Sequence, residues 1–213
     1  MIAIPHPTKR FIDDERTFLE FLIQQYPKLH DEWKAKTLKE FEKQADEVAE
    51  GDEEVRLDVY HSLASGLDEY DSAADTFHRA MLIMVYSYYE TVVHLLYQKA
   101  KRVPPLAKLC EANNIRLNKE RQDDLNFLYN VIRPVRNHFV HNNRPDTAED
   151  SKEMEQLKAI CQARQDLDVN DGRLTLTNDT LSLEALKRAH RTLSYVAEKL
   201  GYTTKYIGKT PNK

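Results

Sequence analysis

Glycine is scarce in this chain, with five residues among 213. The phosphate loop of nucleotide hydrolases and the fingerprint of dinucleotide-binding folds both need clustered glycines, because backbone N–H groups must come close to phosphate. The five glycines lie far apart, at positions 51, 66, 172, 201 and 208. The sequence therefore excludes kinase-like and Rossmann-type chemistry.

Cysteine and long apolar runs are also lacking. Two cysteines, Cys110 and Cys161, are too few for a disulfide framework or a cysteine zinc site. The mean hydropathy is −0.67, and no apolar run approaches the roughly 18 residues that a membrane span needs. Residues 1–7 lack the basic and apolar regions of a signal peptide. We therefore expect a cytoplasmic protein without a membrane segment.

A basic surplus is absent as well. The chain has 31 Lys and Arg against 35 Asp and Glu, a net charge of −4, whereas proteins that hold nucleic acid by bulk electrostatics are usually basic. Residues 40–58 contain nine acids and two bases, and removing this −7 leaves the rest of the chain at +3. The plain interpretation of the acidic segment (residues 40–58) is a solvated helix face. The global charge excludes only diffuse binding of nucleic acid.

What the sequence does contain is helical periodicity over most of its length. The pattern over residues 73–101 is apolar on most sides, which predicts a helix at the centre of a bundle. Alternation around Asp171-Gly172 predicts a β-hairpin over residues 167–178. We expect an all-α helical bundle with a short C-terminal β-hairpin before the last helix. The expected helices are residues 17–26, 33–48, 55–70, 73–101, 105–110, 119–139, 149–163 and 182–200.

Prolines and capping residues set the expected boundaries. Pro27 should stop the first helix, and Pro134 should kink its helix or begin a new one at its first turn. Asn118 and Ser182 are expected helix caps, and Gly201 should close the last helix. The expected organisation is an N-terminal helical extension (residues 1–72), a helical bundle (73–200) and a mobile basic tail (201–213).

The segment over residues 125–145 has a composition of its own. It contains no acid, but three arginines and two histidines, namely Arg133, Arg136, Arg144, His138 and His141. Judged from the residues alone, an arginine of a bundle more often pairs with a carboxylate than serves catalysis. The two histidines could hold a metal, but no third or fourth ligand is marked, so we expect no metal and no cofactor.

The hexapeptide RNHFVH at residues 136–141 resembles the signature of the HEPN (higher eukaryotes and prokaryotes nucleotide-binding) superfamily. The apolar helix before it, with YYET at residues 88–91, is similar to that family's first core helix. The resemblance covers about residues 73–200, which would make this region a HEPN-like bundle. It implies a metal-independent endoribonuclease of the toxin or antiviral-defence type. Such an enzyme cleaves RNA through its 2′-hydroxyl, leaves a cyclic phosphate, and forms a composite site at a homodimer interface.

Two other functions stay open at this point. One is a catalytically inactive HEPN-like module that docks a partner protein or a nucleotide. The other is an immunity or regulatory protein whose acidic segment imitates nucleic acid. An antitoxin or regulatory protein is a further class of partner for the ribonuclease.

The expected catalytic residues are Arg136, His141 and Asn137. The planar guanidinium of Arg136 suits two phosphate oxygens, an imidazole such as His141 exchanges protons near neutral pH, and Asn137 could orient His141 or hydrogen-bond the substrate. In an ideal helix Arg136 and His141 lie about 140° apart, so a second chain could complete the site. The expected substrate-binding residues are Arg133, His138, Arg144 and Glu90.

Two of these interpretations carry alternatives. Glu90 could point toward the site or only cap a polar network in the core, and the second is the more common arrangement. Tyrosines of the same helix could stack RNA bases, but at helical spacing such residues more often belong to the core. They are Tyr86, Tyr88, Tyr89 and Tyr97.

Overall fold

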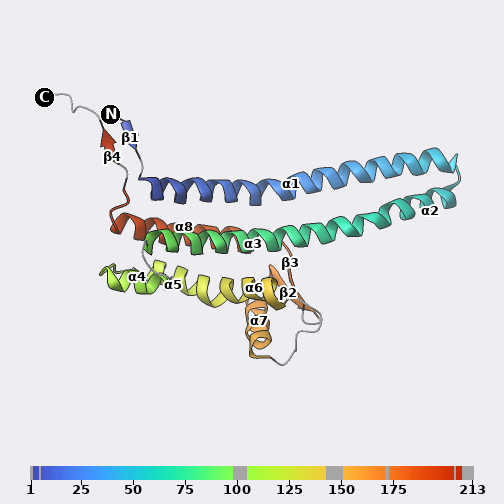
Figure 1. The fold of residues 1–213 in the computed structure, drawn as a ribbon. Coiled ribbons are helices and arrows are strands. Elements are labelled where there is room, and N and C mark those ends of the chain that lie inside the picture. Colours follow the sequence, from blue (N-terminus) through green and yellow to red (C-terminus); the bar gives the residue numbers. More distant parts are fainter. Residues whose placement is uncertain are drawn as a thin grey trace.

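The computed structural model describes residues 2–4, 6–97, 105–142, 151–170, 173–203 and 205–207. Figure 1 shows its helices in three layers. Helix α1 (Pro7–Ala49) forms the first layer, α3 (Asp68–Tyr97) and α8 (Thr180–Lys199) form the second, and the third contains α4 (Leu106–Ala112), α5 (Lys119–Phe127) and α6 (Arg133–Asn137). The short α7 (Lys152–Gln162) projects from the third layer, away from the other two layers. The predicted all-α bundle is confirmed.

Helix α1 runs without interruption through Pro27, so the prediction of a stop at this residue is wrong. An interior proline removes one backbone hydrogen bond and costs about 3 kcal/mol. Side-chain packing just before the proline offsets this cost. Ile23 is buried, and the ring of Tyr26 stacks on that of Phe77 with 3.6 Å between centroids. The helix also begins earlier than expected, at Pro7, where Nδ1 of His6 accepts a hydrogen bond from the amide of Thr8.

The second half of α1 pairs with α2 (Glu53–Ala64), which a 3₁₀ turn (Ser65–Leu67) joins to α3. We call residues 28–67 the helical arm, because they extend away from the other layers in Figure 1. No side chain of α2 is buried, and only two small side chains of α1, Ala45 and Ala49, are buried along the arm. Apolar side chains such as Leu29, which is 63% exposed, remain in contact with water. The acidic segment lies at the end of this thinly packed arm.

Helix α3 lies at the centre of the hydrophobic core, as the sequence predicted. Its residues Leu82, Val85 and Val92 are fully buried, and they belong to one cluster with Leu186 and Leu193 of α8. The shared core therefore determines which side of α3 packs against α8. Other residues of α3 are free to line the pocket described below.

The helix that carries the RNHFVH segment begins at Asn118, whose side chain accepts a hydrogen bond from the amide of Arg121 at 3.0 Å. It continues through two wide π-helical turns, Leu128–Ile132 and His138–Asn142, on either side of α6. Pro134 lies in the first turn of α6, as predicted. Because proline has no N–H, the carbonyl four residues earlier receives no helical hydrogen bond, and a widened turn accommodates this loss. We call residues 119–142 the motif helix.

The predicted hairpin is confirmed. Strands β2 (Leu167–Asn170) and β3 (Arg173–Leu176) pair antiparallel, with Leu167 opposite Leu176. The Asp171-Gly172 turn lies outside the described residues. Gly201, with φ of 86°, follows the end of α8 as predicted.

The start of α8 differs from the prediction. The helix begins at Thr180 with Asp179 at the N-cap position, and Ser182 is buried within its first turn. The carboxylate of Asp179 makes no cap hydrogen bond, because it contacts Nδ1 of His78 at 2.5 Å. The amide of Thr180 instead donates to the side chain of Asn178.

Two strands that the sequence did not predict join the chain's ends. Strand β1 (Ile2–Ile4) pairs antiparallel with β4 (Lys205–Ile207), which belongs to the segment expected to be a mobile tail. Nearby, the rings of His6 and Tyr202 are 4.6 Å apart. Residues 208–213 lie outside the described residues.

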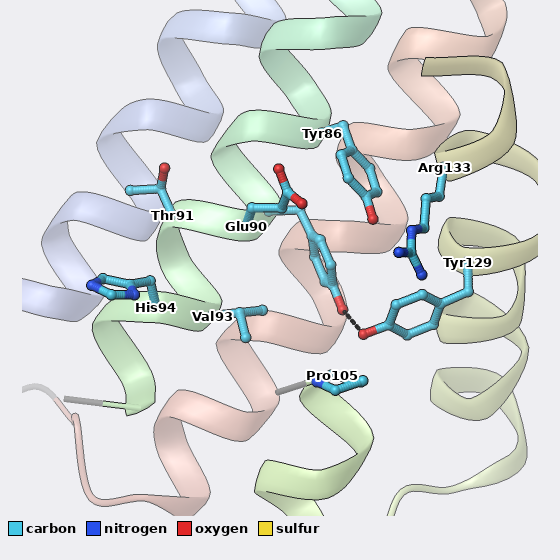
Figure 2. Close-up of a pocket in the computed structure, with 9 residues that line it drawn as sticks. Tyr86, Glu90, Thr91, Val93, His94, Pro105, Tyr129 and Arg133 are labelled. Carbon is cyan, nitrogen blue, oxygen red and sulfur yellow. Dashed lines mark hydrogen bonds between the residues drawn. The ribbon is translucent and has the colours of Figure 1, made fainter. Parts of the chain in front are cut away.

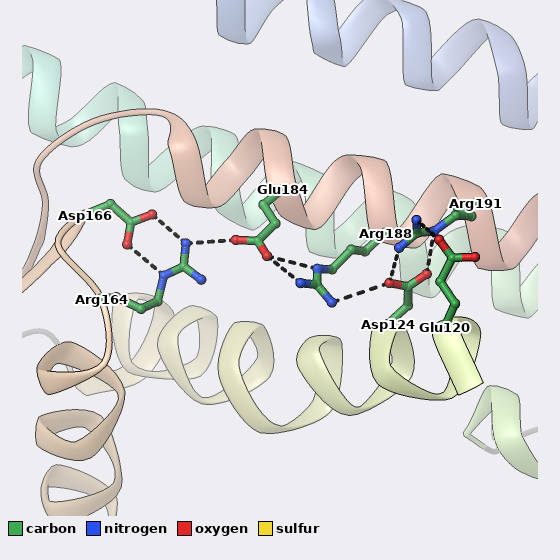
Figure 3. A network of polar contacts seen from close by, with 7 residues as sticks. All are labelled: Glu120, Asp124, Arg164, Asp166, Glu184, Arg188 and Arg191. Atoms are coloured by element: carbon green, nitrogen blue, oxygen red, sulfur yellow. Dashed lines mark hydrogen bonds and ion pairs between the residues drawn. The ribbon is translucent and has the colours of Figure 1, made fainter. Parts of the chain in front are cut away.

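A chain of ion pairs holds the motif helix against α8 (Figure 3). Asp124 of α5 is fully buried, and its carboxylate accepts hydrogen bonds from Nε and Nη2 of Arg191 at 2.8 and 2.6 Å. Nη1 of Arg188 approaches the same carboxylate at 3.4 Å. Since α5 is the first part of the motif helix, these contacts fix where the motif helix lies along α8.

The ion-pair chain continues beyond Arg188 to the segment after α7. Arg188 donates to Glu184 at 2.7 Å, and Glu184 also accepts from Arg164 at 2.9 Å. Arg164 donates twice to Asp166, at 2.7 Å for each bond. The hydrogen bond to Asp166 raises the pKa of Arg164 above its ordinary value.

Candidate functional site

Two adjoining pockets flank the motif helix. The tyrosine pocket, of about 560 Å³, is lined by Tyr86, Tyr89, Glu90, Thr91, Val93, His94, Pro105, Tyr129 and Arg133. Figure 2 shows it between α3 and the motif helix. The histidine pocket, of about 440 Å³, is lined by Tyr129, Arg133, Pro134, Asn137, His141, Glu153 and Gln156. Because Tyr129 and Arg133 line both pockets, one extended ligand can occupy the two pockets together.

Three of the predicted site residues share one face of the motif helix. Arg133, Asn137 and His141 are spaced four residues apart, which aligns side chains along a helix, and all three line the histidine pocket. Arg133 and His141 are exposed. Arg133 pairs with no carboxylate in the part of the chain that the structure describes. Its charge is therefore available to an anion in either pocket.

Arg136 lies on the adjacent face of the motif helix, toward α3. Its Nη1 donates to the side-chain oxygen of Asn137 at 3.0 Å, and its Nη2 lies 3.8 Å from a carboxylate oxygen of Glu90. Its guanidinium carbon is 5.7 Å from the ring centroid of Tyr86, within the range of a cation–π contact. The side chain is 22% exposed. Arg136 is thus partly buried, and polar neighbours and an aromatic ring together hold its guanidinium in place.

The π-helical turn at His138–Asn142 changes the angle between Arg136 and His141. Each residue of a π-helix turns less around the axis than in an α-helix, since its hydrogen bonds join residues five apart. The turn therefore moves His141 back toward the face of Arg136 compared with the separation of about 140° in an ideal α-helix. Such turns occur frequently at functional sites.

Glu90 points toward the tyrosine pocket, which answers one question that the sequence left open. Its carboxylate is 54% exposed and lines the pocket beside Tyr86 (Figure 2). Burial, followed by the charge of Glu90, raises the pKa of Tyr86 to about 12. The Tyr86 hydroxyl therefore keeps its proton at neutral pH and can donate a hydrogen bond.

Two predicted substrate-binding residues are not part of either pocket as described. His138 is fully buried, and its Nδ1 lies 3.8 Å from a carboxylate oxygen of Glu153 on α7. This contact joins α7 to the motif helix, so His138 supports the site from within the core. Arg144 lies outside the described residues.

The tyrosines divide between core and pocket. Tyr88 belongs to the core, and its hydroxyl donates to the carbonyl of Ile12 at 3.1 Å. Tyr86 and Tyr89 are mostly buried but line the tyrosine pocket. Tyr97 is half-buried against the core.

His94 and Tyr129 are pocket residues to which the sequence analysis gave no site role. The signal for His94 was present, because it lies four residues after Glu90 and eight after Tyr86, on one face of α3. Tyr129 lies four residues before Arg133 on the motif helix. The same spacing rule would have selected both residues.

The fold and the site together define a mostly helical protein with an Arg-Asn-x-x-x-His segment beside two open pockets. Comparison of the chain with protein-family models, curated proteins and solved structures gives no match. Among the described residues, no cluster of three or more His, Cys, Asp or Glu side chains could hold a metal ion. No helix within the described ranges has the length and apolarity to cross a membrane.

Proposed function

We propose that this protein is a metal-independent endoribonuclease that cleaves RNA through its 2′-hydroxyl, of the toxin or antiviral-defence type. One observation carries the proposal. An exposed imidazole, His141, lies on the same face of the motif helix as the guanidinium of Arg133, which pairs with no carboxylate among the described residues. A proton acceptor and a phosphate ligand on one face are two of the groups that cleavage of RNA requires, since RNA supplies its own nucleophile.

In the proposed reaction the 2′-oxygen attacks the adjacent phosphorus, and the bond from phosphorus to the 5′-oxygen of the next nucleotide breaks. His141 takes the proton of the 2′-hydroxyl. An imidazolium returns a proton to the leaving 5′-oxygen. The products are a 2′,3′-cyclic phosphate and a 5′-hydroxyl, so protons and bonds balance without water. Arg136 and Arg133 stabilise the negative charge that grows on the phosphoryl oxygens.

The second imidazole comes from a second copy of the chain in this proposal. His141 is the only histidine that lines the histidine pocket among the described residues. One imidazole cannot accept the first proton and donate the second in the same step. A homodimer that brings two motif helices together supplies both groups and forms a composite site.

The test is cleavage of a synthetic RNA by the purified protein in the presence of EDTA. His141→Ala and Arg136→Ala should each abolish cleavage. Arg10→Ala and His61→Ala remove the same residue types at exposed positions away from the pockets and should leave cleavage unchanged. A 2′-deoxy nucleotide at the cut position should block the reaction, because it removes the nucleophile. Intact cleavage by both motif variants would overturn the proposal, and so would cleavage at the deoxy position.

A second candidate function rests on the contacts of Arg136. Its guanidinium already has Asn137 and Glu90 as neighbours, which suits a catalytically inactive HEPN-like module that docks a partner protein or a nucleotide. In that case the wild-type protein should bind a fluorescently labelled nucleotide in an anisotropy titration and cleave no RNA. Arg133→Ala should weaken the binding.

A further inference from the structure

The tyrosine pocket has the size and the walls of a small-molecule site. Its volume of about 560 Å³ lies within the range of roughly 300–1,000 Å³ that is usual for ligand pockets. Tyr86, Tyr89 and Tyr129 supply aromatic surface on two sides, from α3 and from the motif helix (Figure 2). Aromatic walls of this kind stack planar rings, including nucleobases.

Two hydrogen-bond donors of the pocket, Tyr129 and Arg133, lie on the motif helix. The hydroxyl oxygen of Tyr129 accepts from the hydroxyl of Tyr89 at 3.0 Å and from the amide of Leu106 at 3.1 Å. Both lone pairs of this oxygen are therefore used, and its own proton is left for an acceptor in the pocket. Arg133 projects from the same helix and lines the same pocket (Figure 2). This side of the pocket suits the oxygen atoms of a phosphate or a ribose.

The acceptor of the pocket lies on α3. Glu90 is the only carboxylate among its described lining residues. One oxygen of Glu90 lies 3.8 Å from Arg136, a distance too long for a hydrogen bond. Both carboxylate oxygens can therefore accept hydrogen bonds from a ligand. A planar ligand with two adjacent N–H donors fits this arrangement best, because a carboxylate accepts such a pair with both oxygens.

We propose that the tyrosine pocket binds guanine, with N1–H and the 2-amino group of the base donating to Glu90. Among the RNA bases, guanine alone presents two neighbouring N–H donors on its Watson–Crick edge. Adenine and cytosine present a donor next to a ring acceptor, which the carboxylate repels, and uracil presents one donor between two carbonyls. The phosphate of the same nucleotide lies at Arg133, where the tyrosine pocket meets the histidine pocket.

This inference rests in part on the proposed function, since it makes guanine the base next to the phosphate that is cut. An RNA that places its guanine in the tyrosine pocket brings the adjoining phosphate to Arg133 and His141. The cut then falls beside guanine in single-stranded RNA, where the Watson–Crick edge is free.

The first experiment measures binding of 3′-GMP, 3′-AMP, 3′-CMP and 3′-UMP to the full chain by isothermal titration calorimetry. We expect 3′-GMP to bind at least tenfold more tightly than the other three. Glu90→Gln should weaken 3′-GMP by about ten- to one-hundredfold, the loss expected when hydrogen bonds to a charged group are removed. It should change 3′-UMP little. Glu111→Gln, an exposed carboxylate of α4 outside the pocket, is the matched control.

Equal binding of the four nucleotides would overturn the inference, and so would a Glu90→Gln variant that binds 3′-GMP normally. Circular dichroism confirms that the variants are folded. A second arm uses oligouridine RNAs with one guanine, one adenine or no purine, and maps the cut. Cleavage that ignores guanine overturns the inference and leaves the ribonuclease in place. Tight 3′-GMP binding that Glu90→Gln weakens, without cleavage of any RNA, supports the guanine site and overturns the ribonuclease.

Discussion

Replacing the buried carboxylate of Asp124 should destabilise the protein more than any other single charge change in the ion-pair chain of Figure 3. Asp124→Asn keeps the shape of the side chain but removes its charge. One of its oxygens becomes an NH₂ group that faces the N–H donors of Arg191. The variant therefore loses the electrostatic attraction to Arg191, and the new NH₂ group and the N–H groups of Arg191 repel each other at a buried position.

The size of the effect follows from the contacts. Asp124 accepts hydrogen bonds from Arg191, Arg188 and the hydroxyl of Thr192. Breaking a buried ion pair costs about 3–5 kcal/mol, mainly because a charge is left without a partner. Arg191 is 42% exposed, so water can solvate its freed guanidinium, and we take the lower end, about 3 kcal/mol. For a chain of this length that corresponds to a fall in Tm of roughly 6–12 °C.

Differential scanning calorimetry and urea unfolding of the variants measure this loss. Glu120→Gln is the control, because Glu120 pairs with the same Arg191 but is 54% exposed. Exposed pairs contribute less than about 1 kcal/mol. If Asp124→Asn unfolds at the same temperature as Glu120→Gln, burial does not determine the strength of this contact, and the reasoning fails.

Three further predictions concern the rest of the fold. Burial raises the pKa of Tyr86 to about 12 from the ordinary value of 10.0, and the pKa values of Tyr88 and Tyr89 also rise. Their stabilisation is complete below pH 10 and is lost as the pH rises toward 12, by about 1.4 kcal/mol per pH unit for each tyrosine. Urea unfolding measures the free energy of unfolding at each pH from 10 to 12. In Tyr88→Phe the loss that the three tyrosines cause per pH unit should be about a third smaller, and an unchanged loss would show that Tyr88 does not contribute. Amides of the helical arm should exchange with deuterium sooner than those of α3 near Val85 and Val92, because the arm has almost no buried side chains; equal protection would refute this. Pro27→Ala restores a backbone hydrogen bond and should raise the free energy of unfolding by about 1–3 kcal/mol, whereas a lower midpoint in denaturant would show that the proline is favourable where it is.

The fold was predictable wherever one local signal dominated. The apolar periodicity of α3, the Asn118 cap and the alternation around the hairpin each correspond to an observed element. Pro27 misled the prediction, because its local cost is offset by a contact between Tyr26 and Phe77, residues 51 positions apart in the sequence. A similar long-range contact, from His78 to Asp179, occupies the side chain that would otherwise cap α8.

The helix that carries the candidate site could be predicted from the sequence. The residues of other helices that contact it could be predicted less well. Asn137 was expected to lie near enough to orient His141, and the structure has both residues in one pocket together with Arg133. The burial of His138 could not be read from the sequence, because it depends on where α7 packs. The position of Glu90 beside Arg136 likewise depends on how α3 lies against the motif helix.

Pro27 also has a mechanical consequence for the helical arm. It lies just beyond Ile23, the last buried residue of α1 before Ala45, and it leaves one backbone hydrogen bond of α1 unmade at that point. The returning half of the arm, α2, is also separated from α3 by a 3₁₀ turn. From Pro27 to Ala49 the helix extends about 33 Å, so a rotation of about 10° at the proline moves the tip by about 6 Å. A rotation at Pro27 would therefore displace the negatively charged tip further than any other part of α1.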